Sequence, residues 1–170
     1  MPLPALRTAR LFLEPFAAAD LDALHALWTD ADVRRYLWDD LVIPRERAAE
    51  TLRDALATAE REGIGHWTLR EEAGGAVIGD AGFQLVPGTS EVELMGCLRK
   101  LFWGRGLAAE AMRCVLDYLW QTTSHPRVYA RTDPPNERSL RLMERLGMHR
   151  ESSGTLITYV LDRPRARVLY

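Results

Sequence analysis

The sequence predicts an α/β protein with a mixed sheet and helices on both of its faces. Residues 66–98 hold three strand-like segments separated by a Gly-Gly and a Pro-Gly turn, a spacing that favours an antiparallel meander. Helical patterns precede this meander, and after it helices and strands alternate. A chain of 170 residues can bury one ordinary core, so we expect a single domain over residues 1–170.

The first half of the chain shows one strand, two helices and the meander. Residues 10–14 alternate apolar and polar side chains, as a half-buried strand does. Amphipathic helices are expected over 18–29 and 44–61, the second opening on Pro44, whose missing N–H is harmless in a first helical turn. Residues 33–40 between them read as an irregular aromatic and acidic segment. The strands of the meander are expected at 66–72, 76–86 and 91–98.

The second half alternates helix and strand. Apolar spacing predicts a long amphipathic helix over 106–121, followed by a strand at 127–132. A further helix over 136–146 is ended by Gly147. Two last strands are expected near 148–152 and 155–162.

Composition excludes several classes of protein. Hydrophobic residues make up 47% and charged residues 27% of the chain, which indicates a globular protein. A net charge of −2 makes general affinity for nucleic acid or an anionic membrane unexpected. The sequence shows no long apolar run and no secretory signal, so we expect a cytoplasmic location by elimination. Cys97 and Cys114 lack metal-ligand spacing, and no metal is expected.

Residues 103–110, Trp-Gly-Arg-Gly-Leu-Ala-Ala-Glu, carry the most information about function. They lie where a strand ends and a helix begins, and a helix N-terminus offers unpaired N–H groups and a partial positive charge. Gly104 and Gly106 lack Cβ atoms, so backbone amides can close on an anion. The segment therefore predicts a pyrophosphate site. A glycine-softened turn without a ligand is the alternative.

Two other phosphate-binding motifs are alternatives for this segment. The sole lysine, Lys100, precedes the glycines, which excludes the Walker pattern. Residues 104–109 match the dinucleotide fingerprint G-x-G-x-x-G/A, with Asp133 as a candidate ribose-binding acid. The meander and the short stretch after Asp133 do not suit a doubly wound sheet. A nicotinamide-dependent reductase is therefore only the second hypothesis for this protein, behind the pyrophosphate site of a different fold.

The segment 103–108 resembles the central motif Q/R-x-x-G-x-G/A of the GNAT superfamily of acetyl-CoA-dependent N-acetyltransferases. Gly106 and Ala108 match, and Trp103 stands where the motif has Gln or Arg. This variant is similar to the branch that contains the ribosomal-protein N-terminal alanine and serine acetyltransferases. Further segments at the spacing of that branch are Leu6–Leu11, Arg35–Leu37, Ile78–Asp80 and the set Asn136, Ser139, Leu146 and Gly147.

The resemblance implies a GNAT fold: a mostly antiparallel, six- to seven-stranded sheet that splays between strands four and five, counted from residues 10–14. It also implies acetyl-CoA as co-substrate, with pantetheine beside the fourth strand, Glu91–Leu98. The residues that it assigns to coenzyme binding are Cys97, Leu98, Arg99, Trp103, Gly104, Arg105, Gly106, Leu107, Ala108, Ala109 and Asn136.

Acetylation of an amine requires the amine to lose a proton. On the fourth strand beside the implied thioester, Glu93 is the first candidate for the base and Glu91 the second; both also read as solvent-facing strand residues. Many family members donate to the leaving thiolate from a tyrosine at the position of Met143, which cannot donate, and Ser139 is its substitute. The alternative is that Ser139 only caps the start of its helix by accepting hydrogen bonds from backbone N–H groups.

Tyr36, Trp38, Asp39 and Asp40 fall in the region that borders the acceptor cleft in this family. Aromatic rings and carboxylates suit a cationic amine, although an exposed loop is the alternative. We therefore expect an N-acetyltransferase whose acceptor is a protein N-terminus or a small-molecule amine. A homodimer is an expectation from the resembling branch. Besides the reductase, the alternative left open is a GNAT-like module that binds acyl-CoA without catalysis.

Overall fold

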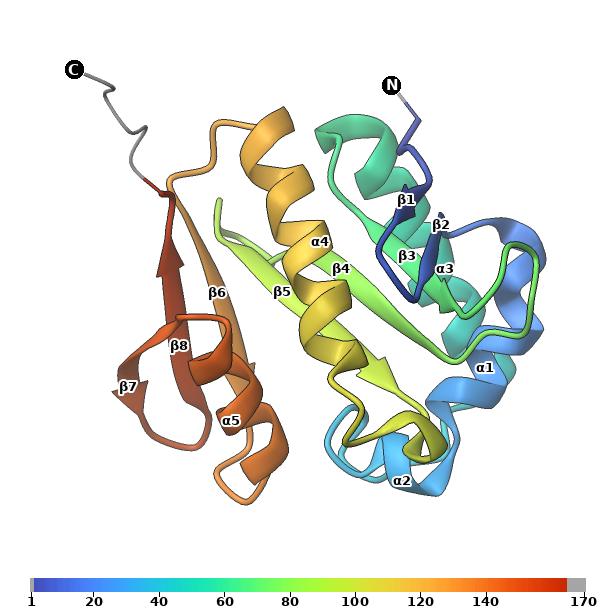
Figure 1. Cartoon of the computed structure of the whole chain (residues 1–170). Helices are drawn as coiled ribbons and strands as arrows, with labels where there is room; N and C mark the ends of the chain where they lie inside the picture. Colours follow the sequence, from blue (N-terminus) through green and yellow to red (C-terminus); the bar gives the residue numbers. More distant parts are fainter. Residues whose placement is uncertain (1, 165–170) are drawn as a thin grey trace.

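The computed structural model describes residues 2–164. The domain predicted over residues 1–170 includes Met1 and residues 165–170, which lie outside the described residues. Within the described part, eight strands form one sheet in the order β1-β2-β3-β4-β5-β6-β8-β7 (Figure 1). The strands are β1 (Leu6–Arg7), β2 (Phe12–Pro15), β3 (His66–Arg70), β4 (Gly79–Leu85), β5 (Val92–Leu98), β6 (Arg127–Thr132), β7 (His149–Ser153) and β8 (Ile157–Asp162).

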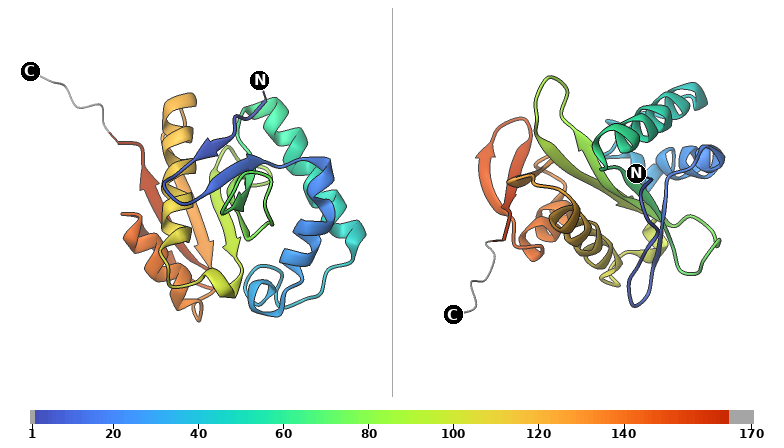
Figure 2. Two further views of the ribbon diagram at one scale, coloured as in Figure 1. Left: turned by 45° about the vertical axis from the view of Figure 1, so that its right-hand side comes forward. Right: turned by 90° about the horizontal axis from the view of Figure 1, so that it is seen from above.

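Helices cover both faces of this sheet (Figure 2). Helices α4 and α5 lie on one face, where α4 packs on β4 and β5 and α5 on β6. Helices α1 and α3 pack together on the opposite face and enclose a second apolar cluster with Phe16 and Val77. The described helices are α1 (Leu21–Trp28), α2 (Ala31–Arg34), α3 (Arg45–Glu62), α4 (Leu107–Thr122) and α5 (Glu137–Arg145). In the described chain we find no helix with the length and apolarity that crossing a bilayer requires.

The pairing of β5 with β6 is the exception in this sheet. Every other neighbouring pair is antiparallel, as the short turns of the meander predict. Strands β5 and β6 run parallel and share one register pair, Glu93 with Tyr129. Beyond that pair the two strands diverge toward their carboxyl ends (Figure 1). A doubly wound parallel sheet, which the dinucleotide-binding reading requires, is not what the chain forms.

The structure corrects the predicted number of strands, several boundaries and one segment expected to be irregular. The strand expected at 10–14 begins at Phe12, and that expected at 76–86 spans only Gly79–Leu85. The sheet has eight strands instead of six or seven, because the two residues of β1 pair with β2, a length too short to show a periodic pattern. The helix expected over 18–29 begins with a 3-10 turn, and α1 itself starts at Leu21. Part of the segment expected to be irregular is helix α2, whose Asp30 side chain accepts a hydrogen bond from the backbone N–H of Asp32.

Candidate active site

A cleft of about 820 Å³ opens where β5 and β6 diverge. Its walls come from the carboxyl half of β5, the loop before α4, the first turns of α4, the end of β6 and helix α5. Further lining residues come from α2 and the turn after it: Asp32, Val33, Arg35, Tyr36 and Leu37. This volume is in the range of small-molecule and cofactor sites. The cleft therefore lies at the carboxyl ends of the two diverging strands, where the resemblance places pantetheine.

The N-terminus of α4 faces this cleft with unpaired backbone amides. Gly104 and Gly106 have φ angles of +75° and +77°, a conformation that costs other residues free energy. The helix has no side-chain cap. Within the described chain, the amides of residues 104–109 donate no hydrogen bond to a protein acceptor, and the first helical bond is that of Glu110 to Gly106. These free N–H groups and the helix dipole make a site for an anion.

Trp103 fixes the loop that precedes α4. Its indole Nε1–H donates to the carbonyl oxygen of Leu98 at 2.6 Å, which ties the loop to the end of β5. The guanidinium of Arg138 on α5 lies over the same ring, 3.8 Å from its centroid. Arg138, Arg141 and Arg145 all line the cleft, so α5 brings cations opposite the free amides. Sequence reasoning missed these arginines, although their spacing places them along one side of the predicted helix.

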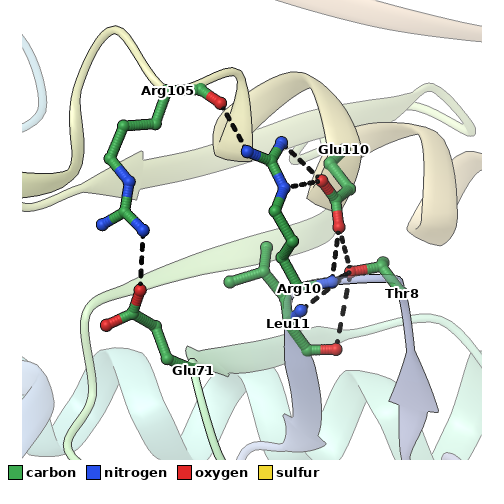
Figure 3. A network of polar contacts seen from close by, with 6 residues as sticks. All are labelled: Thr8, Arg10, Leu11, Glu71, Arg105 and Glu110. Carbon is green, nitrogen blue, oxygen red and sulfur yellow. Dashed lines mark hydrogen bonds and ion pairs between the residues drawn. The ribbon is translucent and has the colours of Figure 1, made fainter.

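A polar network holds the first turn of α4 against the start of the sheet (Figure 3). The carboxylate of Glu110 accepts from Thr8 Oγ1 at 2.5 Å and pairs with Arg10 at 2.6 Å. Arg10 also donates to the carbonyl oxygen of Arg105 at 2.8 Å. The hydrogen bond from Thr8, followed by the contacts with Arg10, lowers the pKa of Glu110. The network therefore positions the glycine loop from outside the cleft.

The structure brings together most of the residues predicted to bind the coenzyme. Two of them do not line the cleft: Arg99 and Arg105. The Arg105 side chain instead pairs with Glu71 at 2.9 Å (Figure 3), and Arg99 donates to the carbonyl oxygen of Val77. The predicted residues that do line it are Cys97, Leu98, Trp103, Gly104, Gly106, Leu107, Ala108, Ala109 and Asn136.

The two predicted bases lie at the closed end of the strand pair. Arg131 on β6 contacts Glu91 at 2.6 Å and Glu93 at 3.5 Å. Glu93 is 8% exposed and also accepts a hydrogen bond from Gln84. Neither glutamate lines the cleft, whose β5 wall begins at Leu94. Both carboxylates are therefore engaged with a cation across the β5–β6 junction.

Ser139 and Asn136 lie together at the start of α5. The Asn136 side chain caps the helix by accepting from the N–H of Ser139 at 3.4 Å, and it donates to Thr132 Oγ1 at 3.0 Å. Asn136 thus fills the capping role that was the alternative for Ser139. Ser139 lines the cleft with Met143, which is buried.

The predicted acceptor segment divides into a part at the cleft and a part away from it. Tyr36 lines the cleft, and its hydroxyl donates to the carbonyl oxygen of Pro135 at 3.4 Å. Trp38 packs 6.1 Å from the Trp28 ring instead. Asp39 and Asp40 are exposed with positive φ angles and do not line the cleft. Asp40 is paired with Arg34 at 3.2 Å.

Asp80 is a cleft residue to which the sequence assigned no role. It lies on β4, is 5% exposed and lines the cleft. Trp28 Nε1 donates to its Oδ2 at 2.7 Å, and Cys97 Sγ lies 3.6 Å from the same oxygen. Burial raises its pKa to about 6, against the opposing effect of these hydrogen bonds. One signal was visible: an acidic residue inside the apolar run of residues 76–86.

The cysteine beside Asp80 is not placed to act as a nucleophile. Burial, followed by the negative charge of Asp80, raises the pKa of the Cys97 thiol well above 9. A neutral thiol is a weak nucleophile.

No group of three or more potential metal ligands occurs among the described residues.

Known proteins share both sequence and fold with this chain. The sequence matches the family model of the acetyltransferase (GNAT) domain over residues 10–149. The uncharacterized N-acetyltransferase p20 of Bacillus licheniformis is 24% identical over 150 residues, which cover 88% of this chain and 84% of that protein. An acetyltransferase from Agrobacterium tumefaciens str. C58 has a TM-score of 0.83 at 26% identity, with 95% of each chain covered.

A ribosomal L7/L12 alpha-N-protein acetyltransferase, solved in complex with coenzyme A, has a TM-score of 0.78 at 14% identity. The comparison covers 94% of this chain and 98% of that one, and it shows a shared fold. The similarity to the ribosomal branch stays a prediction from the motifs. The match over residues 10–149 and the shared architecture confirm the predicted GNAT fold. The chain belongs to the GNAT family of acetyltransferases.

Proposed function

We propose that this acetyltransferase uses acetyl-CoA to acetylate the nitrogen of a primary amine, either a protein N-terminus or a small molecule. The observation that carries the proposal is the set of free amides at residues 104–109, facing a cleft between diverging strands. The ribosomal L7/L12 acetyltransferase of the same fold was solved with coenzyme A, which supports the choice of co-substrate.

The residues present fit the coenzyme. Its pyrophosphate would contact the amides of the glycine loop, where Gly104 and Gly106 leave the backbone uncovered. Arg138, Arg141 and Arg145 would add positive charge along the ADP portion. Pantetheine would lie along residues 94–98 of β5, whose edge toward β6 has no strand partner past Glu93. The bound coenzyme supplies the activated acetyl group.

The opposite end of the cleft is proposed for the acceptor. Arg35, Tyr36 and Leu37 line it there, and the tyrosine ring suits an ammonium or an aliphatic stem. Ser139 remains the proposed donor to the leaving sulfur because it lines the cleft. The contact of Glu93 with Arg131 argues against free access of substrate to that carboxylate.

The decisive experiment follows the release of free thiol from acetyl-CoA with a panel of amines and N-terminal peptides, analysed by mass spectrometry for acetylated product. We expect one acetyl group on a nitrogen for each thiol released. Binding of acetyl-CoA with no release for any acceptor would favour the non-catalytic module. Thermal stabilisation by NAD(P)H and not by acetyl-CoA would contradict the choice of co-substrate. The cytoplasmic location and the homodimer stay predictions, and size-exclusion chromatography with light scattering tests the second.

A further inference from the structure

A buried carboxyl group with spare acceptor capacity, that of Asp80, lines the cleft. Asp80 lies in the middle of the sheet, paired in register with Thr68 on β3 and Cys97 on β5. Within the described chain, the side-chain hydrogen bonds from Trp28 and Cys97 both fall on Oδ2, and the backbone of Cys97 also donates to the carboxyl group. A carboxylate has about four acceptor sites, so Oδ1 keeps capacity for another donor. A buried carboxyl group in a cleft is costly unless a partner arrives.

The position of Asp80 relates it to the proposed thioester. Its register partner Cys97 belongs to the β5 segment beside which pantetheine would lie, and both residues line the cleft. Along β5, Glu93, Met95 and Cys97 alternate with residues that face α4. Asp80 therefore lies on the sheet face opposite α4, on the side of Trp28 and α1. An amine that approaches from this face would meet the carboxylate before it reaches the acetyl group.

We propose that Asp80, through Oδ1, binds the acceptor amine and takes its proton. This inference rests on the proposed N-acetyltransferase function. A protonated amine has no free electron pair, so a base must act before the nitrogen can attack. A C–N bond then forms between the acceptor and the acetyl carbon, and the C–S bond breaks. One proton of the ammonium passes to Asp80 and on to solvent, and a second ends on the sulfur of coenzyme A.

The environment of Asp80 suits proton transfer near neutral pH. A pKa of about 6, raised by burial, keeps the group mostly ionised at pH 7 and still able to accept a proton. Glu93 is a weaker candidate, because it is held by Arg131 and Gln84 and does not line the cleft. The titratable group in contact with Asp80 is the Cys97 thiol, and Arg99 follows on the same chain segment. The neighbouring elements also carry His66 and Arg70 on β3, Glu93 on β5, and Asp22 and His25 on α1. Helix α3, which packs on β4, carries the charged residues of the segment Arg45–Glu62.

The test measures kcat/KM against pH for the wild type and the Asp80→Asn variant, with an amine identified in the thiol-release screen. We expect kcat/KM at pH 7 to fall about 100-fold or more, and the acidic limb near pH 6 to disappear. The dissociation constant for acetyl-CoA should stay within about twofold, which also shows that the variant is folded. The exposed-residue variant Asp54→Asn is the matched control and should keep both rate and limb.

A second variant separates a proton acceptor from a merely structural residue. Trp28→Phe removes one hydrogen bond to the ionised carboxylate, so the acidic limb should move to higher pH by about one unit. A limb that persists in Asp80→Asn, or that disappears in Glu93→Gln alone, would overturn the assignment to Asp80. A wild-type protein that acetylates no amine would instead overturn the proposed function on which the inference rests.

Discussion

The two ends of the cleft are built in different ways. At the phosphate end, the amides of residues 104–109 are contiguous in sequence, and within the described chain they donate no hydrogen bond to a protein acceptor. At the acceptor end, Trp28, Asp80 and Cys97 come from three separate elements and are joined by hydrogen bonds to one buried oxygen. One end binds through exposed backbone, and the other through a desolvated side chain.

This difference decides how each end responds to change. Backbone amides keep their charge distribution at any pH, so anion binding there depends on the conformation of the loop and the local charge. A buried carboxyl group couples to pH through its shifted pKa. Substitutions at the phosphate end should therefore change the affinity for the coenzyme. Substitutions at the acceptor end should change how stability and rate depend on pH.

The largest expected effect concerns stability and pH at the acceptor end. Burial raises the pKa of Asp80 from 3.8 to about 6, so the folded state binds more protons than the unfolded state between these values. The stabilising contribution of the group is full below pH 4 and is lost as pH rises through 6. Between pH 7.5 and 4, the wild type should gain about 2 kcal/mol in unfolding free energy relative to Asp80→Asn. Urea unfolding at several pH values measures this difference.

Glu110, a carboxylate at the phosphate end, should show the opposite dependence of stability on pH. The Thr8 hydrogen bond lowers the pKa of Glu110, so its contribution is lost as pH falls. Relative to Glu110→Gln, the wild type should lose stability toward acid, by a smaller amount because the site is partly exposed to solvent. Parallel pH curves for both variants would contradict the contrast between the two ends.

The next effect concerns the affinity for acetyl-CoA. Gly104→Asp should raise the dissociation constant at least about tenfold, equal to about 1.4 kcal/mol, because a carboxylate beside the free amides repels phosphate. Isothermal titration calorimetry measures this constant. A Cβ at Gly104 meets no atom within 4 Å, and Asp tolerates a positive φ.

Gly88→Asp is the matched control for that variant. Gly88 has a φ of +76°, equally open surroundings and a place in the β4–β5 turn. Its substitution should leave the dissociation constant unchanged, and Gly104→Asn should raise it less than Gly104→Asp. An equal loss of affinity in all three would indicate backbone strain rather than charge.

The smallest expected effect comes from the support of the glycine loop. Arg10→Met removes the ion pair with Glu110 and the hydrogen bond to the carbonyl oxygen of Arg105. Because this pair is partly exposed, we expect only about a threefold rise in the dissociation constant for acetyl-CoA, near 0.6 kcal/mol. Arg45→Met, which breaks the exposed pair with Asp22, is the control and should have no effect on binding.

The fold could be predicted from sequence largely because its determinants are local. The Gly-Gly and Pro-Gly turns define the meander, and the glycine loop before α4 is one contiguous motif. Only the resemblance of Leu6–Leu11 indicated the two-residue β1, and the four-residue α2 escaped prediction, because such short elements exist through pairing and capping rather than periodicity.

Within the site, only the contiguous glycine loop could be predicted from sequence; the contacts between distant residues could not. Asp80 acquires its burial and its hydrogen bonds from residues 52 and 17 positions away along the chain, and no sequence pattern encodes that meeting. The ion pairs of Glu91 and Glu93 with Arg131 arise in the same way, from the junction of β5 with β6. The positive φ angles of Asp39 and Asp40, which do not line the cleft, were equally hidden.

The lone register pair between Glu93 and Tyr129 has one more consequence. It divides the sheet into a larger block of β1–β5 and a smaller block of β6–β8, and few main-chain bonds connect them. A ligand bound between the blocks contacts both, so its binding free energy also stabilises the association of the two parts of the sheet. Occupancy by coenzyme would then govern how cooperatively the whole molecule melts.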